Sequence, residues 1–412
     1  MPHALSIPLV VAACGALFFL GHALEALFRR HRIPDVLPLI VVGYLVGPAT
    51  GWIRPLGGTT IEHVFSHVAL IIILFHGGLD LRLAAMKESA LPALHVSLGG
   101  MGLNVLVVTA LAHWTGAQTW QASILLGVAL APLAATVAIP LLEHLRLSPR
   151  TGAMLTLESA LGDVVTVVGV LTLAGAFAGA GSGVGHAIGG FLSSLFAALV
   201  IGLAAALFWS LVLGRVQQLA KTSFATEALL LVVAGLTEWL GFSGAIGALA
   251  FGIGLRNLDH LLPPSLAKSL RLNPQGLTET ENALLAEAVF ILKLFFFVYL
   301  GTQIRLNDIR ILGMGALVTL ALVVIRQAFF HGQKALAPEA AERRLVAWLI
   351  PKGLATAVVA SVPLEMGLPG GAWIRDVAYA VIPISILVTS LGVALLARKP
   401  APEAQDPDDA PS

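Results

Sequence analysis

The stretch that decides the fold of this chain is Thr151-Gly-Ala-Met-Leu-Thr-Leu-Glu158-Ser159-Ala-Leu-Gly162-Asp163-Val-Val-Thr-Val-Val-Gly-Val170. It is long and apolar enough to cross a membrane, yet it carries two carboxylates, Glu158 and Asp163. A charged side chain near the centre of a bilayer costs roughly 2.5–3.5 kcal/mol on insertion scales. Carboxylates in such a place usually face a water-filled cavity, where they bind or relay ions. The stretch therefore predicts a membrane protein that handles ions.

The composition fits this setting. Hydrophobic residues make up 57% of the chain and charged residues 11%, whereas soluble domains carry roughly 25% charged residues. The formal net charge of +1 provides no basic surface, so we expect no nucleic-acid partner. The chain has neither a His-Glu-x-x-His motif nor a nucleophile elbow, which argues against a membrane-embedded hydrolase that uses the two carboxylates. We expect a transporter rather than an enzyme, with no cofactor beyond the transported ions.

Apolar runs of helix-spanning length recur along almost the whole chain and predict an all-α integral membrane protein of about thirteen transmembrane helices. The expected spans are 5–28, 34–50, 61–80, 91–113, 119–142, 151–178, 187–213, 224–241, 243–257, 283–303, 309–331, 343–365 and 375–397. We expect residues 1–398 to form one transmembrane domain and the Pro-, Asp- and Ala-rich residues 399–412 to form a disordered cytoplasmic tail.

The charges of the loops predict the orientation. If the first loop, which carries Arg29, Arg30 and Arg32, is cytoplasmic, the loops on the outer side hold only Arg54, Arg305, Arg310 and Arg375. This is the bias of the positive-inside rule. We therefore expect a multi-pass protein of the cell (inner) membrane, with its N-terminus outside and its C-terminus in the cytoplasm.

The two halves of the chain resemble each other. The third span ends in Gly78-Leu-Asp-Leu-Arg82, and the tenth ends in Gly301-Thr-Gln-Ile-Arg305, each after an aromatic-rich helix. With six spans in each half and one connecting span, the seventh, matching spans run in opposite directions. The pattern predicts inverted six-helix repeats.

The fifth and twelfth spans match in a second way. Each carries a mid-span proline, Pro132 or Pro351, followed by an Ala-Thr step and a later proline before a glutamate. Gly- or Pro-interrupted spans at matching positions of two repeats indicate a binding site near the midplane of the membrane. Interrupted helices free backbone groups and direct their partial charges at an ion. The sequence therefore predicts two crossing broken helices.

These residues resemble the monovalent cation/proton antiporter superfamily, in particular the electroneutral branch of sodium/hydrogen exchangers. The resemblance covers roughly residues 30–395 and the motifs come in the expected order. They are Ile33-Pro34 to Gly47-Pro48, Leu74-Phe75-His76-Gly77-Gly78-Leu79-Asp80, Glu158-Ser159-Ala-Leu-Gly162-Asp163 and Pro351-Lys352-Gly353. Arg326 falls where that branch keeps a buried arginine.

The resemblance implies a sodium/proton antiporter-like fold and the exchange of Na⁺ or K⁺, with Li⁺ as a further candidate, for H⁺. In the family the proton and the cation compete for one carboxylate, and a core domain is thought to move against a dimerisation domain. The resemblance alone implies a homodimer.

Three positions depart from the family pattern. The broken fifth span reads Leu133-Ala-Ala-Thr136 and has no acid, Gly162 replaces an asparagine, and His76 replaces an acid. In relatives that acid and the asparagine help to hold the buried arginine. The three changes therefore affect one neighbourhood.

We assign Asp163 as the acceptor that the proton and the cation share. Ser159 and Asp163 are four residues apart and lie on one helix face, whereas Glu158 lies roughly 140° away from Asp163. Oxygen ligands from Asp163, Glu158, Ser159 and Thr136 would suit a hard monovalent cation. The alternative is a permanent ion pair of Asp163 or Glu158 with Arg326 that never titrates. A single titrating aspartate favours 1:1, electroneutral exchange.

Four further positions are expected to support the site. Arg326 is a fixed counter-charge, because arginine does not readily lose its proton. Lys352 balances the carbonyl dipoles of a broken helix or repels cations, unless it snorkels to the surface. His76 is either a pH modulator beside Arg326 or a packing residue. Glu158 would reach the site either sideways or through a distortion of the helix near Gly162.

Two other transporter classes share this architecture. A cation-coupled symporter of an organic anion would need anion-binding donors near the broken spans, and Lys352 is one candidate. A potassium efflux system of the same fold is the other, although the chain carries no nucleotide-binding domain of the kind that gates such systems.

Overall fold

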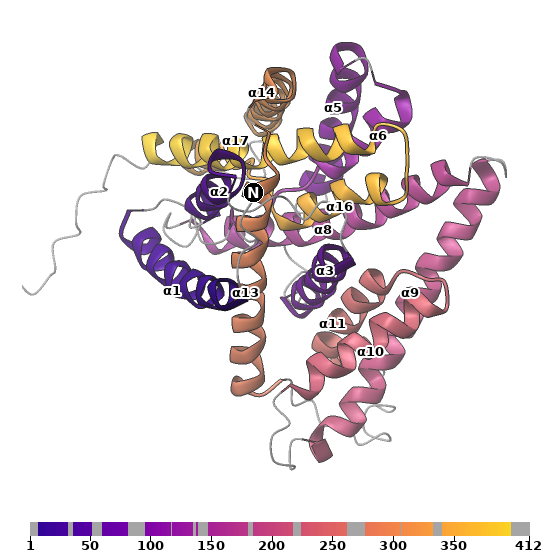
Figure 1. Ribbon diagram of the computed structural model, residues 1–412. Helices are drawn as coiled ribbons and strands as arrows, with labels where there is room; N and C mark the ends of the chain where they lie inside the picture. Colours follow the sequence, from indigo (N-terminus) through magenta and orange to yellow (C-terminus); the bar gives the residue numbers. More distant parts are fainter. Residues whose placement is uncertain are drawn as a thin grey trace, which may run out of the picture.

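The computed structural model describes residues 7–31, 36–51, 60–80, 95–116, 118–134, 137–138, 147–179, 184–216, 224–261, 277–305, 307–332 and 340–396, and the regular structure within them is helical (Figure 1). The elements of the first half are α1 (Ile7–His31), α2 (Val36–Tyr44), the π-helix η1 (Leu45–Ala49), α3 (Thr60–Asp80), the π-helix η2 (Val96–Gly100), α5 (Met101–Gly116), α6 (Trp120–Ala129) and α8 (Pro149–Ala178). Those that follow are α9 (Val184–Val216), α10 (Ala225–Trp239), α11 (Gly244–Leu261), α13 (Glu279–Gln303), α14 (Ile309–Gly332), α15 (Ala340–Val346), α16 (Leu354–Glu365) and α17 (Gly371–Leu396).

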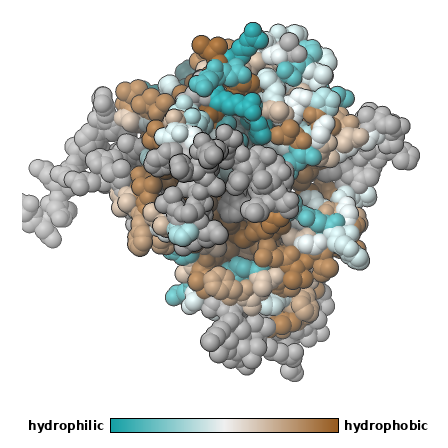
Figure 2. Space-filling model, viewed as in Figure 1, coloured by the Kyte–Doolittle hydropathy of each residue, from teal (hydrophilic) through white to brown (hydrophobic). Residues whose placement is uncertain are grey.

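A helix lies in each of the thirteen ranges that the sequence predicts as spans, so the predicted all-α class is confirmed. Within the described residues, six helices are individually long and apolar enough to cross a membrane, and shorter apolar helices occupy most of the other ranges. Hydrophobic side chains cover much of the face that Figure 2 shows, as expected for a surface that meets lipid. The predicted tail, 399–412, lies outside the described residues.

The helices pack in two groups. One group holds α2, α3, α9, α10, α11 and α13, and the other holds α5, α6, α8, α14, α15, α16 and α17. In Figure 1, α9, α10 and α11 lie side by side at the lower right, and α16 and α17 lie above α3. The second group contains both interrupted spans, so it carries the candidate site.

A close helix crossing joins α3 to α11. A Cβ atom on Gly252 would lie 2.2 Å from the backbone oxygen of Phe75, and one on Gly78 would lie 2.5 Å from the backbone oxygen of Leu249. Neither position can hold a side chain without a shift of backbone. Glycine is therefore required on both sides of this crossing.

The same crossing recurs between α2 and α13. A Cβ atom on Gly43 would lie 1.9 Å from the backbone oxygen of Val298, and one on Gly301 would lie 2.2 Å from that of Ile40. In all four cases the carbonyl belongs to the residue three positions before the facing glycine. Because each crossing joins one helix from each half, the contacts relate the two halves in the way that the sequence repeat predicts.

We expect Gly252→Ala to lower the stability of the folded protein by about 1–3 kcal/mol, because its methyl group would overlap a carbonyl oxygen that the helix cannot easily move. The change in melting temperature of the detergent-purified protein measures this effect. Gly235→Ala on α10 is the matched control, since a Cβ atom there meets nothing within 4 Å. Equal melting temperatures for the two variants would contradict the close contact between α3 and α11 at Gly252.

Candidate functional site

Two interrupted spans cross at the centre of the second helix group. The helix α6 ends at Ala129, and the chain from Leu130 to Ala134 is not helical. The chain is also non-helical between α15 and α16, and there the N–H of Ala134 donates a hydrogen bond to the carbonyl of Pro351 at 2.9 Å. Each interruption contains a proline, which has no N–H to continue a helix. The predicted pair of crossing broken helices is confirmed.

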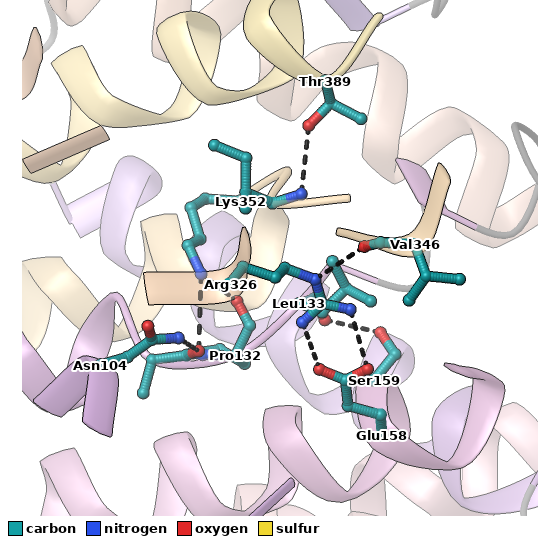
Figure 3. Close-up of polar contacts among 11 residues, drawn as sticks. Asn104, Pro132, Leu133, Glu158, Ser159, Arg326, Val346, Lys352 and Thr389 are labelled. Carbon is teal, nitrogen blue, oxygen red and sulfur yellow. Dashed lines mark hydrogen bonds and ion pairs between the residues drawn. The ribbon is translucent and has the colours of Figure 1, made fainter. Parts of the chain in front are cut away.

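Lys352 joins the two interrupted segments. Its side chain is only 2% exposed, and its Nζ donates to the carbonyl of Pro132 at 2.6 Å and lies 3.5 Å from that of Ala131 (Figure 3). The ammonium group therefore sits on backbone carbonyls that the end of α6 leaves unpaired. It does not extend to the protein surface.

Hydroxyl groups of α17 satisfy the backbone of the second interruption. The N–H of Lys352 donates to Ser385 Oγ at 3.0 Å, and the N–H of Ile350 donates to Thr389 Oγ1 at 3.2 Å. Both hydroxyls are fully buried. An irregular backbone segment at membrane depth needs such partners, because lipid offers none.

Arg326 and Glu158 form a buried, two-pronged ion pair. Arg326 Nη1 and Nη2 donate to the two carboxylate oxygens at 2.6 and 3.0 Å, and the side chains are 11% and 6% exposed (Figure 3). Arg326 Nε donates to the carbonyl of Val346 at 3.0 Å, and the guanidinium lies 4.9 Å from the ring centre of Phe330. Of the pairings considered from the sequence, the structure therefore contains the one between Glu158 and Arg326.

Asp163 lies further along α8, beyond the ion pair, and is half-buried. Within the described part of the chain, no group donates a hydrogen bond to its carboxylate. The charge that acts on it is that of Lys352, which also feels the charges of Arg326 and Glu158. The four charged groups thus form one electrostatically linked cluster, in which Asp163 is the acid without a bidentate partner.

The face of α8 next to Asp163 touches the first interruption. Ser159 Oγ donates to the carbonyl of Leu133 at 2.6 Å, and a Cβ atom on Gly162 would lie 3.0 Å from Pro132 Cβ. The small residue at position 162 lets the helix approach this segment closely. A larger side chain at position 162 would press against Pro132 and need more room.

Two predicted site residues are not brought into this cluster by the described contacts. Thr136 lies outside the described residues. His76 is half-buried on α3, and its role as a pH modulator stays a prediction. Of the two ways in which Glu158 could reach the site, the distortion of α8 near Gly162 is absent, because α8 is one continuous helix from Pro149 to Ala178.

Asn104 is a site residue that the sequence reasoning missed. Its Nδ2 donates to the carbonyl of Ala131 at 3.2 Å, and its Oδ1 is buried without a partner among the described residues. It lines a cavity of about 10 Å³ together with Arg326 and Lys352, the size of one water molecule. The available signal was the single amide side chain in a largely apolar predicted span.

Glu342 ties α15 to the start of α8. Its carboxylate is 6% exposed and accepts hydrogen bonds from the N–H of Ser148 at 2.5 Å and from Thr151 Oγ1 at 2.7 Å. Ser148 is the N-cap residue of α8, so the carboxylate also faces the positive end of the helix. Burial raises the pKa of Glu342, but the hydrogen bonds from Thr151 and Ser148 outweigh it and hold that pKa below its ordinary value.

We expect Glu342→Gln to destabilise the protein by about 1.5–3 kcal/mol at neutral pH, because hydrogen bonds to a charged group are lost. A lowered folded-state pKa gives stability that is present above the unfolded pKa, roughly 4.3, and is lost as the pH falls through the folded value. The difference in melting temperature from the unmodified protein should therefore be full at neutral pH and shrink in acid. A difference that stays constant with pH would contradict this account.

Inverted halves, two broken helices that cross and buried charges at the crossing define a multi-pass membrane protein of the sodium/proton antiporter fold. The sodium proton antiporter MjNhaP1 from Methanocaldococcus jannaschii has this fold, with a TM-score of 0.74 over 94% of this chain and 97% of that one, at 19% identity. The chain belongs to the family described as sodium/hydrogen exchanger, transmembrane, whose model matches residues 15–399. The family resemblance and the fold predicted from the sequence are confirmed.

Curated relatives carry antiporter names. The K⁺/H⁺ antiporter NhaP2 of Shewanella oneidensis is 23% identical over 385 residues, which cover 91% of this chain and 64% of the relative. The K⁺/H⁺ antiporter NhaP of Alkalimonas amylolytica is 23% identical over 95% of this chain and 67% of the relative. This chain thus spans about two thirds of the length of the curated relatives that it matches.

Proposed function

We propose that this chain is a secondary transporter that exchanges a monovalent cation for H⁺, with Asp163 as the site that both ions share. The observation that carries the proposal is the contrast between the two acids of α8. Glu158 is neutralised by two short hydrogen bonds from Arg326. Asp163 is half-buried beside the crossing, and among the described residues no group donates a hydrogen bond to its carboxylate, although the charge of Lys352 acts on it. A carboxylate in that position can take up either a proton or a cation.

Na⁺ and K⁺ are the proposed cations, with Li⁺ as a further candidate. The relatives named as K⁺/H⁺ antiporters favour K⁺, and the fold shared with a sodium proton antiporter favours Na⁺. Oxygen ligands suit either ion, and the carbonyls and hydroxyls at the crossing supply them. Ser159 and Thr136 are the proposed hydroxyl ligands, and Glu158 would join them only if its pair with Arg326 opened.

The stoichiometry follows from the same contrast. Glu158 and Arg326 cancel each other's charge, so we infer that one acid titrates in each cycle and that exchange is 1:1 and electroneutral. A transport rate that depends on membrane voltage would contradict this inference.

We also infer a homodimer in the cell membrane, with the C-terminus in the cytoplasm. Cross-linking in membranes tests the homodimer. Protease access from each side of the membrane tests the orientation.

An organic-anion symporter is the less favoured alternative. The cavity lined by Arg326, Lys352 and Asn104 measures about 10 Å³, which would not admit an organic anion. Nζ of Lys352 is also already held by the Pro132 carbonyl. Both observations argue against a large anion at this position.

Inside-out membrane vesicles test the proposal. A proton gradient is imposed and followed with a pH-sensitive dye, and Na⁺, K⁺, Li⁺ or choline is then added as the chloride salt. We expect at least one alkali cation, but not choline, to collapse the gradient. Vesicles without the protein provide the baseline. The proposal fails if no alkali cation relieves the gradient in vesicles that contain the folded protein.

A further inference from the structure

A second cavity, with both polar and apolar walls, lies apart from the crossing, between the last turns of α14 and the helix α15. It measures about 130 Å³. It is lined by Gln327, Phe330, His331, Ala340, Arg343, Arg344 and Ala347. None of the described residues that line it is an acid. Two guanidinium groups, an imidazole and an amide therefore surround a space that suits an anion.

The position of α14 sets the depth of this cavity in the membrane. The helix is long and apolar enough to cross a bilayer, and Leu317, Leu320 and Val324 on it are 39%, 60% and 58% exposed. At about 100° per residue, Gln327 and His331 continue the same face towards the end of the helix. The exposed apolar stripe would contact acyl chains, so the cavity lies where this stripe ends, at the level of the lipid headgroups.

The chemistry of the walls matches a phospholipid in particular. Arg344 presents N–H donors that fit phosphate oxygens, and it is oriented by a hydrogen bond from its Nε to the carbonyl of Ala340 at 3.3 Å. Phe330, Ala340 and Ala347 add apolar surface beside them. By the positive-inside rule, this end of α14 lies on the cytoplasmic side, where basic pockets between transmembrane helices meet anionic headgroups.

We propose that this cavity binds the phosphate headgroup of an anionic phospholipid, whose acyl chains lie along the exposed stripe of α14. The cavity shares its wall with the buried ion pair. Phe330, which lines it, lies against the guanidinium of Arg326, and Val346, next to Ala347, accepts the hydrogen bond from Arg326 Nε. A bound lipid would thus brace the residues that hold Arg326 in place.

Native mass spectrometry of the whole chain tests lipid binding without any measurement of transport. The purified protein is titrated with phosphatidylglycerol and with phosphatidylcholine of identical acyl chains. We expect tighter binding of phosphatidylglycerol, by about fivefold for each arginine engaged. Arg344→Gln should reduce this preference by about fivefold. Arg310→Gln is the matched control, because Arg310 is an exposed arginine at the opposite end of α14 and its loss should leave the preference unchanged.

Three results would overturn the proposal. The first is equal binding of the two lipids by the unmodified protein. The second is an equal loss of preference in Arg310→Gln and Arg344→Gln, which would indicate general attraction of charge. The third is displacement of phosphatidylglycerol by millimolar inorganic phosphate, which would indicate a site for free phosphate. His331→Gln is a second test variant beside Arg344→Gln, because both side chains are exposed.

Discussion

Asp163→Asn should abolish cation-driven proton movement and reduce it to the baseline of vesicles without the protein. Asparagine has nearly the shape of aspartate but can neither carry a proton at this position nor offer a negative charge to a cation. Because the carboxylate has no hydrogen-bond donor among the described residues, the amide should not disturb packing. The melting temperature should therefore stay near that of the unmodified protein while exchange is lost. The dye measurement in inside-out vesicles follows the loss.

Glu227→Gln is the matched control for this variant. Glu227 is also a buried acid within a predicted span, 9% exposed on α10, but it lies in the other helix group. Its replacement removes one carboxylate from the membrane region without touching the crossing, so exchange should persist. Cation-driven collapse of the gradient that survives in Asp163→Asn would reject the role assigned to Asp163.

Glu158→Gln should destabilise the folded protein by about 3–5 kcal/mol, because it leaves the charge of Arg326 buried without its partner. Arg326→Gln should do the same from the other side. The guanidinium is held by two bonds to Glu158 and one to Val346, so its position depends on the carboxylate. Unfolding of each variant in detergent, followed by tryptophan fluorescence, measures the loss.

The double variant separates the pair from other effects. With both charges removed, no charge remains buried alone, so the double variant should be more stable than the sum of the two single losses predicts. If the loss of stability in the double variant equals the sum of the two single losses, the two side chains act independently. Single variants as stable as the unmodified protein would show that the ion pair contributes nothing to the fold.

Much of the architecture could be predicted because it depends on local patterns. Runs of apolar residues predicted the spans, and prolines at Pro132 and Pro351 predicted where two of them break. The glycines Gly78 and Gly301 in the matched motifs predicted the repeat. Their counterparts Gly252 and Gly43 became recognisable only from the helix crossings, because a glycine in a sequence does not reveal which carbonyl faces it.

The partner of Arg326 could not be predicted from the sequence. Glu158 and Asp163 lie roughly 140° apart around α8, and which of them faces α14 depends on how the whole helix is rotated. The contacts of Asn104 and Ser385 could not be predicted either. Their importance comes from backbone groups that the interruptions free, and those groups are identified only once the two segments cross.

If one carboxylate holds either a proton or a metal cation, cation binding must release protons, and this release tests the role proposed for Asp163 most directly. The purified protein is placed in weakly buffered detergent solution, and Na⁺, K⁺ or Li⁺ is added while a pH indicator records the protons that appear. We expect the unmodified protein to release a proton for each cation that it binds, and Asp163→Asn to release none. Cation binding without proton release, or the same release from Asp163→Asn, would contradict the account.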